Sequence, residues 1–95
     1  MAALMIIQAS VSDKAQYKAY QEAVQPLMAS CGGRLKATGV ALEVLEGSHD
    51  GRRLIVFEFP SLEDIRKFWT SAAYAEVKRL RDGAAKIDVW AVPTA

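Results

Sequence analysis

The sequence has one cysteine and one histidine, and its charges nearly cancel. A single cysteine forms no internal disulfide, and one cysteine with one histidine gives no metal-binding motif. We therefore expect no metal site, and no motif points to a cofactor. The formal net charge of +1 also lacks the basic surplus that phosphate backbones attract, which argues against nucleic acid as a partner.

Long hydrophobic runs are missing as well. No apolar stretch approaches the roughly 20 residues that span a bilayer, so no membrane partner is expected. The stretch from Met1 to Ile7 has neither the positive region nor the cleavage site of a signal peptide, and a cytoplasmic location is predicted. At 95 residues the chain can build one core but not two, so residues 1–95 are predicted to form a single domain.

What the sequence does contain is a strongly apolar run over residues 52–59, which ends at Pro60. Side chains of a strand alternate between its faces, and here both faces carry apolar residues, as in a central strand. Further strands are predicted at residues 4–10, at residues 34–46 with a bulge or bend at Gly39, and at residues 86–92. Residues 47–51 have turn chemistry and are predicted to join two of these strands in a hairpin.

Two helical regions are predicted between the strands. The first begins after Ser12 or Asp13, either of which can cap it, and carries an apolar stripe at spacings of three and four. Pro26 removes a backbone donor and is expected to kink or break this helix. Ser61 opens a capping box for the second region, in which Ser71 can cap a further segment.

The order β-α-β-β-α-β predicts an α+β, ferredoxin-like fold: a four-stranded antiparallel sheet, first and third strands central, with two helical segments on one face. The face predicted to lie under the helices carries Met5, Ile7, Leu35, Ala37, Ile55, Phe57, Phe59, Ile87, Val89 and Ala91. The opposite face carries Leu4, Ile6, Gln8, Arg34, Lys36, Leu54, Val56, Glu58, Asp88 and Trp90. Because this second face is too apolar to be exposed to solvent, we predict a homodimer in which two sheets pack face to face as a dimeric α+β barrel.

A carboxylate among apolar neighbours makes Glu58 the first candidate for a functional role. Arg34 as anion anchor and Glu58 as general acid or base, joined by Gln8 and Asp88, would form a polar cluster for a small carboxylate or enol. The competing interpretation is a structural ion pair between neighbouring strands or across the dimer.

Trp69 and Tyr74 are candidates for the wall of a ligand pocket, with the Tyr74 hydroxyl as its polar group. The competing interpretation, helix-to-sheet core, is the commoner role of such residues. His49 lies between glycine-rich turn residues and is expected in an exposed turn rather than at a catalytic centre.

Several short segments together resemble a known bacterial family, the domain of unknown function 1330 family. These segments are Gly32-Gly33-Arg34, Glu43-Val44-Leu45-Glu46-Gly47, Glu58-Phe59-Pro60-Ser61, and Trp69-x-Ser71-x-x-Tyr74 followed by Arg81. The resemblance covers nearly the whole chain and implies a ferredoxin-like protomer of the dimeric α+β barrel superfamily. Arg81 gains functional weight only from this resemblance, since a cation near a helix end is otherwise explained by the helix dipole.

The resemblance implies no established activity, because the wider superfamily includes monooxygenases, isomerases, dehydratases, haem enzymes and proteins without known catalysis. The leading hypothesis is a small dimeric protein that binds a small organic molecule in a cavity between sheet and helices, with cofactor-free catalysis as its enzymatic form. The alternatives are a non-catalytic binding module and a structural or interaction module. The sequence leaves open whether the protein is an enzyme.

Overall fold

The computed structural model describes residues 1–38 and 42–94. The elements follow in the order β1 (Ala3–Val11), α1 (Lys14–Ser30), β2 (Arg34–Thr38), β3 (Arg53–Phe59), α2 (Leu62–Thr70), α3 (Ala72–Lys78), the 3-10 helix η1 (Arg79–Arg81) and β4 (Ala85–Pro93). This is the predicted β-α-β-β-α-β order, with the second helical region divided at Ser71. The predicted α+β, ferredoxin-like class is confirmed.

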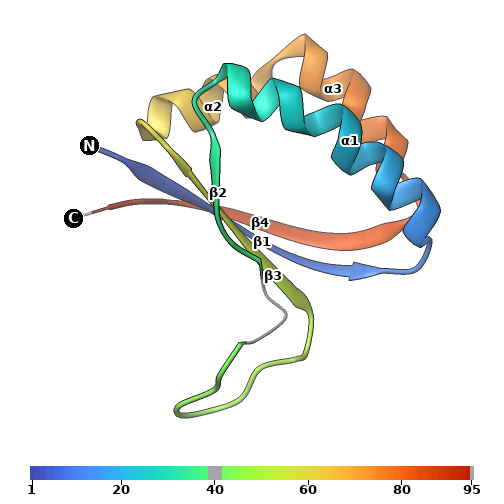
Figure 1. The fold of residues 1–95 in the computed structure, drawn as a ribbon, viewed down its shortest axis with the longest axis vertical. Coiled ribbons are helices and arrows are strands. Elements are labelled where there is room, and N and C mark those ends of the chain that lie inside the picture. Colours follow the sequence, from blue (N-terminus) through green and yellow to red (C-terminus); the bar gives the residue numbers. More distant parts are fainter. Residues whose placement is uncertain (39–41, 95) are drawn as a thin grey trace.

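The sheet has the strand order β2-β3-β1-β4, and every neighbouring pair is antiparallel. The strands β1 and β3 are central, as predicted from their two apolar faces. In Figure 1 the described helices lie together on one side of the sheet. Met5 lies opposite Phe57 on β3 and Ala91 on β4, so these positions share the helix side. We call this side the covered face and the other side the open face.

Side-chain caps set where the helices begin. Asp13, Ser61 and Ser71 each accept a hydrogen bond from the backbone N–H three residues further on, at 3.0 to 3.1 Å. These are the predicted caps. Of the predicted kink or break at Pro26, the break is wrong, because α1 contains this proline and continues to Ser30. The helix is held by its buried side chains on both sides of Pro26, which offsets the one missing backbone hydrogen bond.

The core lies between the helices and the covered face. Its largest fully buried side chains are Phe59 on β3 and Phe68 on α2, whose ring centroids are 6.0 Å apart. The turn after α1 passes directly over the Phe59 ring, because a Cβ atom on Gly33 would lie 2.7 Å from Phe59 Cζ. Only glycine fits there without a shift of the aromatic ring, and the turn closes this end of the core.

The strand β2 differs from the prediction in two ways. A register shift between Leu35 and Ala37 places Ala37 opposite Val56, on the open face and not under the helices as predicted. Residues 42–46 form no strand, because β3 begins only at Arg53 and residues 42–52 have no regular secondary structure, so no partner strand lies beside them. Residues 39–41, with the predicted bend at Gly39, lie outside the described residues.

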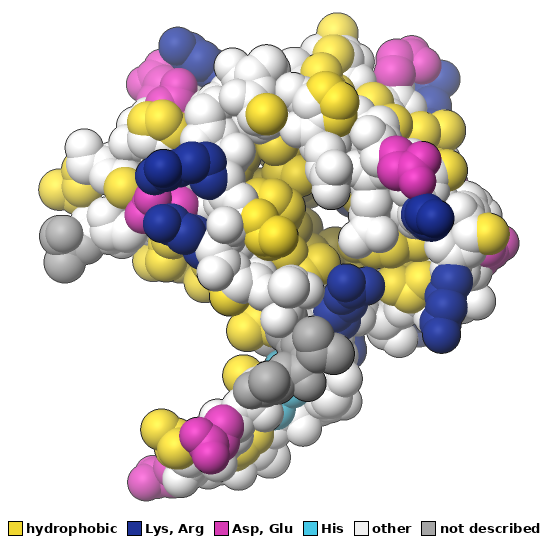
Figure 2. All heavy atoms as spheres, in the orientation of Figure 1, with side chains coloured by type: hydrophobic (Ala, Val, Ile, Leu, Met, Phe, Trp, Pro, Cys, Tyr) yellow, Lys and Arg dark blue, Asp and Glu magenta, His cyan; other side chains and the backbone are white. Residues whose placement is uncertain are grey.

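Residues 42–51 form an arm that extends away from the helices, and Figure 1 shows it on the other side of the sheet. Val44 is 48% exposed on this arm and Leu45 is 88% exposed. Figure 2 shows hydrophobic and acidic side chains along the arm and the histidine where it joins the body. The arm therefore adds exposed apolar surface on the side that the helices leave uncovered.

The open face is apolar along its middle. Leu4, Ile6, Leu54 and Val56 are only half-buried, and Trp90 is 45% exposed. This matches the predicted composition of that face. A contiguous apolar face of this kind is unusual on a protein that acts alone.

Candidate functional site

A cavity of about 230 Å³ lies between α1, the second helical region and the covered face. Figure 2 shows the molecule hollowed between its helices and its sheet, with hydrophobic side chains around the hollow. Six of the apolar side chains that line it are Met5, Ile7, Val24, Met28, Ile55 and Phe57. The volume equals that of about eight water molecules in the liquid, which is room for a small organic molecule.

A pair of buried tyrosines brings two hydroxyl groups together beside this cavity. The hydroxyls of Tyr20 on α1 and Tyr74 on α3 are 3.0 Å apart and share a hydrogen bond. Tyr74 is 2% exposed, and the capping hydrogen bond from its N–H to Ser71 fixes the start of its helix. The Trp69 ring centroid lies 5.2 Å from that of Tyr74, so the Trp69 and Tyr74 rings form one aromatic wall.

Burial raises the pKa of two tyrosines that line this cavity, Tyr20 and Tyr17. Burial, and then the hydrogen bond to Tyr74, raise the pKa of Tyr20 well above its ordinary value of 10.0. Burial likewise raises the pKa of Tyr17, whose ring centroid is 5.6 Å from that of Tyr20. Both phenols therefore stay neutral near pH 7 and act as hydrogen-bond donors rather than as bases.

Two arginines, Arg81 and Arg53, line the same cavity. The guanidinium carbon of Arg81 lies 5.4 Å from the Tyr20 ring centroid, a cation–π distance. Arg53 lies opposite Ala9 in the sheet register, which turns its side chain to the covered face. Positive charge thus lies beside an apolar cavity.

The position of Arg81 is fixed from α1 by Gln16. The Gln16 side-chain amide donates to the carbonyl oxygens of Leu80, at 2.9 Å, and Asp82, at 2.7 Å. These two hydrogen bonds join residues more than 60 positions apart in the chain. They hold the short turn that carries Arg81 against the first helix.

The structure therefore brings together three of the sequence candidates, Trp69, Tyr74 and Arg81, around one cavity. Sequence reasoning missed Tyr20, which was counted only as part of the apolar stripe. It also missed Arg53, although strand alternation places Arg53 on the same face as Ile55. The sequence signal that could have identified both residues is a polar group at a position that the apolar periodicity predicts to be buried.

Arg34 and Glu58 lie elsewhere, on the open face near the edge strand β2. Arg34 Nη2 is 3.0 Å from Glu58 Oε1, and Lys36 Nζ is 3.6 Å from the same oxygen. The Arg34 side chain is 73% exposed and that of Glu58 is 25% exposed. A second hollow, of about 240 Å³, is lined by both residues together with Gly32 and Pro60. At this second hollow the Glu58 carboxylate is therefore already paired with the cations of Arg34 and Lys36.

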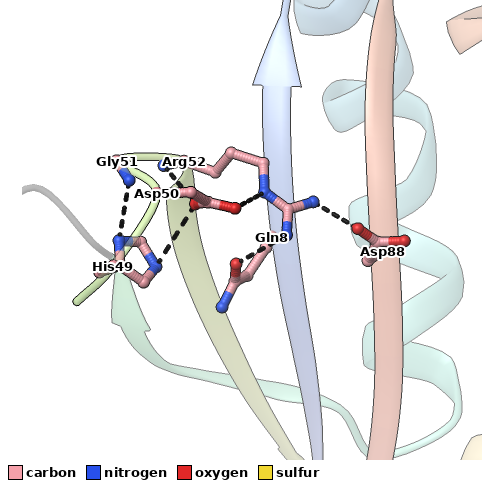
Figure 3. A network of polar contacts seen from close by, with 6 residues as sticks. All are labelled: Gln8, His49, Asp50, Gly51, Arg52 and Asp88. Carbon is pink, nitrogen blue, oxygen red and sulfur yellow. Dashed lines mark hydrogen bonds and ion pairs between the residues drawn. The ribbon is translucent and has the colours of Figure 1, made fainter. Parts of the chain in front are cut away.

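Gln8 and Asp88 are held by a residue that sequence reasoning missed, Arg52, as Figure 3 shows. Its guanidinium donates to Gln8 Oε1 at 3.1 Å, to Asp50 Oδ2 at 2.7 Å and to Asp88 Oδ2. Alternation along the predicted strand at residues 52–59 places Arg52 on the same face as Leu54, but Arg52 was not among the candidates. The register separates this network from Glu58 by four residues along β3, so the four expected members do not form one cluster.

Ion pairing also governs the charge state of this network. The hydrogen bond to Asp88, followed by that to Asp50, raises the pKa of Arg52. The backbone N–H of Arg52, and then its side chain, lower the pKa of Asp50. Arg52 and Asp50 therefore remain a charged pair, which is the behaviour of a structural element.

His49 is less exposed than expected. Its side chain is 20% exposed and its Nδ1 accepts from the Gly51 N–H at 3.1 Å. In the parts of the chain that the structure describes, no group of three or more His, Cys, Asp or Glu residues could hold a metal ion. Within the same parts, no helix is long and apolar enough to cross a membrane.

The family model described as Domain of unknown function (DUF1330) matches residues 2–95 of this chain. None of the curated proteins in the comparison matches it.

Several solved structures share the fold. A protein of unknown function from Rhodopseudomonas palustris has a TM-score of 0.78 at 18% identity, covering 99% of this chain and 82% of its own. A cofactor-independent oxygenase from Streptomyces nogalater has a TM-score of 0.70 at 7% identity, covering 99% and 93%. A dimeric protein of unknown function and ferredoxin-like fold from Bacteroides fragilis has a TM-score of 0.62 at 14% identity, covering 98% and 96%. At these identities the likeness concerns the fold alone.

Proposed function

The chain belongs to the family described as Domain of unknown function (DUF1330), and we propose that it binds a small organic molecule in the cavity between its helices and its sheet. The observation that supports this is the buried Tyr20–Tyr74 hydroxyl pair inside an otherwise largely apolar cavity. An apolar cavity with a few convergent polar groups is the usual form of a small-molecule site. The catalytic form of the proposal adds proton transfer or cofactor-free oxygen chemistry to the same binding step.

A variant that fills the cavity tests the proposal. Val89→Phe adds an aromatic ring at a half-buried position that lines the cavity. We expect it to abolish the binding of small aromatic and aliphatic molecules, measured by ligand-observed NMR on the whole protein. Ala19→Phe, on the exposed side of α1, is the matched control and should bind as the wild type does. Equal binding by the Val89→Phe variant would place the ligand elsewhere.

We further propose that the open face is covered by a second copy of this chain, with the two sheets face to face. The apolar middle of the open face supports this, and so does the fold shared with a Bacteroides fragilis protein described as dimeric. Native mass spectrometry tests it directly. A mass of one chain at micromolar concentration would refute the dimer.

For the open-face charges we propose a structural role. Glu58 has two cations within 4.0 Å and Arg52 is bonded to both Asp50 and Asp88, so each acid has its partner. Paired charges at a sheet seam set register and partner choice at little gain in stability. The catalytic alternative, with Glu58 as acid or base and Arg34 as anchor, requires a substrate in the second hollow.

A further inference from the structure

We propose that the cavity selects a small organic anion, an apolar molecule that carries a carboxylate, and that Arg81 binds the charge. This inference rests on the proposed function, because it names the ligand class of the same cavity. Three observations other than the cavity volume support it. Among the described residues, the arginines that line the cavity have no carboxylate partner, one arginine N–H has no hydrogen-bond partner, and one tyrosine hydroxyl still has a proton to donate.

The cavity holds positive charge without negative charge. Arg81 and Arg53 line it, and no aspartate or glutamate among the described residues does. Within those residues neither arginine has a carboxylate within 4.0 Å, whereas Arg34 and Arg79 each have one and Arg52 has two. A guanidinium beside an apolar cavity pairs well with a carboxylate, which its planar donors match in shape.

One donor of Arg81 is buried and unused. Its Nε–H has no hydrogen-bond partner among the described residues. Buried N–H groups in folded proteins nearly always have a partner, so an unpaired one marks a place where a ligand oxygen or a water belongs. Contact of the guanidinium with the Tyr20 ring restricts its orientation, so little freedom is lost when an oxygen binds.

The tyrosine pair supplies a second donor. Tyr20 and Tyr74 carry two hydroxyl protons, and the 3.0 Å hydrogen bond between them uses one. The other hydroxyl is free to donate to a ligand oxygen. Since burial raises the pKa of Tyr20, this phenol keeps its proton across the neutral range. A carboxylate only accepts hydrogen bonds, so it matches a site whose free polar groups are an arginine N–H and a tyrosine hydroxyl.

The test compares acids with their neutral amides on the wild-type protein. The probes are benzoate, phenylacetate and hexanoate against benzamide, phenylacetamide and hexanamide, with dissociation constants measured by NMR titration. We expect each carboxylate to bind about tenfold or more tightly than its amide. The indole N–H signal of Trp69, in the cavity wall, should shift, while that of Trp90, on the open face, should not.

Variants of the arginine then assign the charge contact. Arg81→Gln should weaken carboxylate binding by about tenfold or more and change amide binding by less than about twofold. Arg81→Lys keeps the charge without the planar fork and should retain part of the preference. Arg79→Gln, on the same 3-10 helix but exposed, is the matched control and should bind as the wild type does.

The outcomes separate the two proposals. If amides bind as tightly as carboxylates, the anion inference is wrong and the proposed binding cavity survives. If no probe of either kind shifts the Trp69 signal, the proposed function itself fails for molecules of this size. Should Arg81→Gln not fold, the wild-type ratio of acid to amide affinity still decides, because it needs no variant.

Discussion

The two faces of the sheet use polar side chains in opposite ways. On the open face the charges are paired, and one member of each pair is exposed, as in Arg34 with Glu58 and Asp88 with Arg52. On the covered face Arg81 lines an apolar cavity without a carboxylate partner among the described residues. A charged side chain that is already paired attracts a charged ligand only weakly, whereas an unpaired one attracts a ligand of opposite charge. We therefore take the pairing state of a charge, more than its neighbours in the sequence, as the guide to function in this fold.

The strongest expected effect concerns the closed end of the covered face. Phe59→Ala should lower the free energy of unfolding by about 3–5 kcal/mol, because it empties a site packed against Phe68 and the turn at Gly33. Denaturant titration measures it. Phe57→Ala is the control, since Phe57 borders the cavity and is half-buried. Its cost should be smaller, and an equal cost would mean that the covered face is packed uniformly and has no open cavity.

The next effect concerns the open face. Ile6→Asp places a carboxylate in its apolar middle, where a second chain would cover it. An unpaired charge buried in an interface costs about 3 kcal/mol or more, which raises the dissociation constant of the dimer more than about 100-fold. Sedimentation equilibrium measures this constant. Ser10→Asp, at the exposed end of the same strand, should leave it unchanged. If Ile6→Asp leaves the dissociation constant of the dimer unchanged, the two chains associate through another surface.

The sequence predicted the covered face better than it predicted the site. Alternation along β1 and β3, and the caps at Ser61 and Ser71, depend on neighbours within a few positions, so the pattern shows them directly. The partnership of Tyr20 with Tyr74 joins residues 54 positions apart, and only the fold brings them together. Alternation places Arg52 on the open face, but its partners Gln8 and Asp88 are 44 and 36 positions away in the chain, so only the fold shows their network.

The arm shows a second reason for failure. Residues 42–46 have a strand-like pattern, but a strand also needs a partner, and β3 begins only at Arg53. Local propensity cannot report whether the partner strand is long enough. The same holds for Ala37, whose face is set by the register shift beside it and not by its own alternation.

A moderate effect is expected from the tyrosine pair. Tyr20→Phe removes one hydroxyl and leaves that of Tyr74 buried without its partner, which should cost about 1–3 kcal/mol of unfolding free energy.

The pair should also make stability depend on alkaline pH. The pKa of Tyr20 is raised in the folded protein, so its contribution is complete below the ordinary pKa of 10.0 and is lost as the pH rises above it. Urea midpoints measured on both sides of pH 10.0 should fall less steeply for the Tyr20→Phe variant than for the wild type. Tyr17→Phe is the control and should retain most of the loss, because Tyr17 has no hydroxyl partner in the pair. An identical slope in wild type and Tyr20→Phe would contradict the assignment.

The smallest effect is expected at Glu58, the first functional candidate in the sequence. Glu58→Gln removes a carboxylate whose partner Arg34 is 73% exposed, so water screens the ion pair and the loss should stay below about 1 kcal/mol. Arg34→Gln combined with it in a double-mutant cycle measures the pair energy directly. Benzoate affinity should not change in either variant, because neither side chain lines the cavity under the helices. A loss of benzoate binding on Glu58→Gln would move the site to the open face, and the contrast between paired and unpaired charges would then fail as a guide to function in this fold.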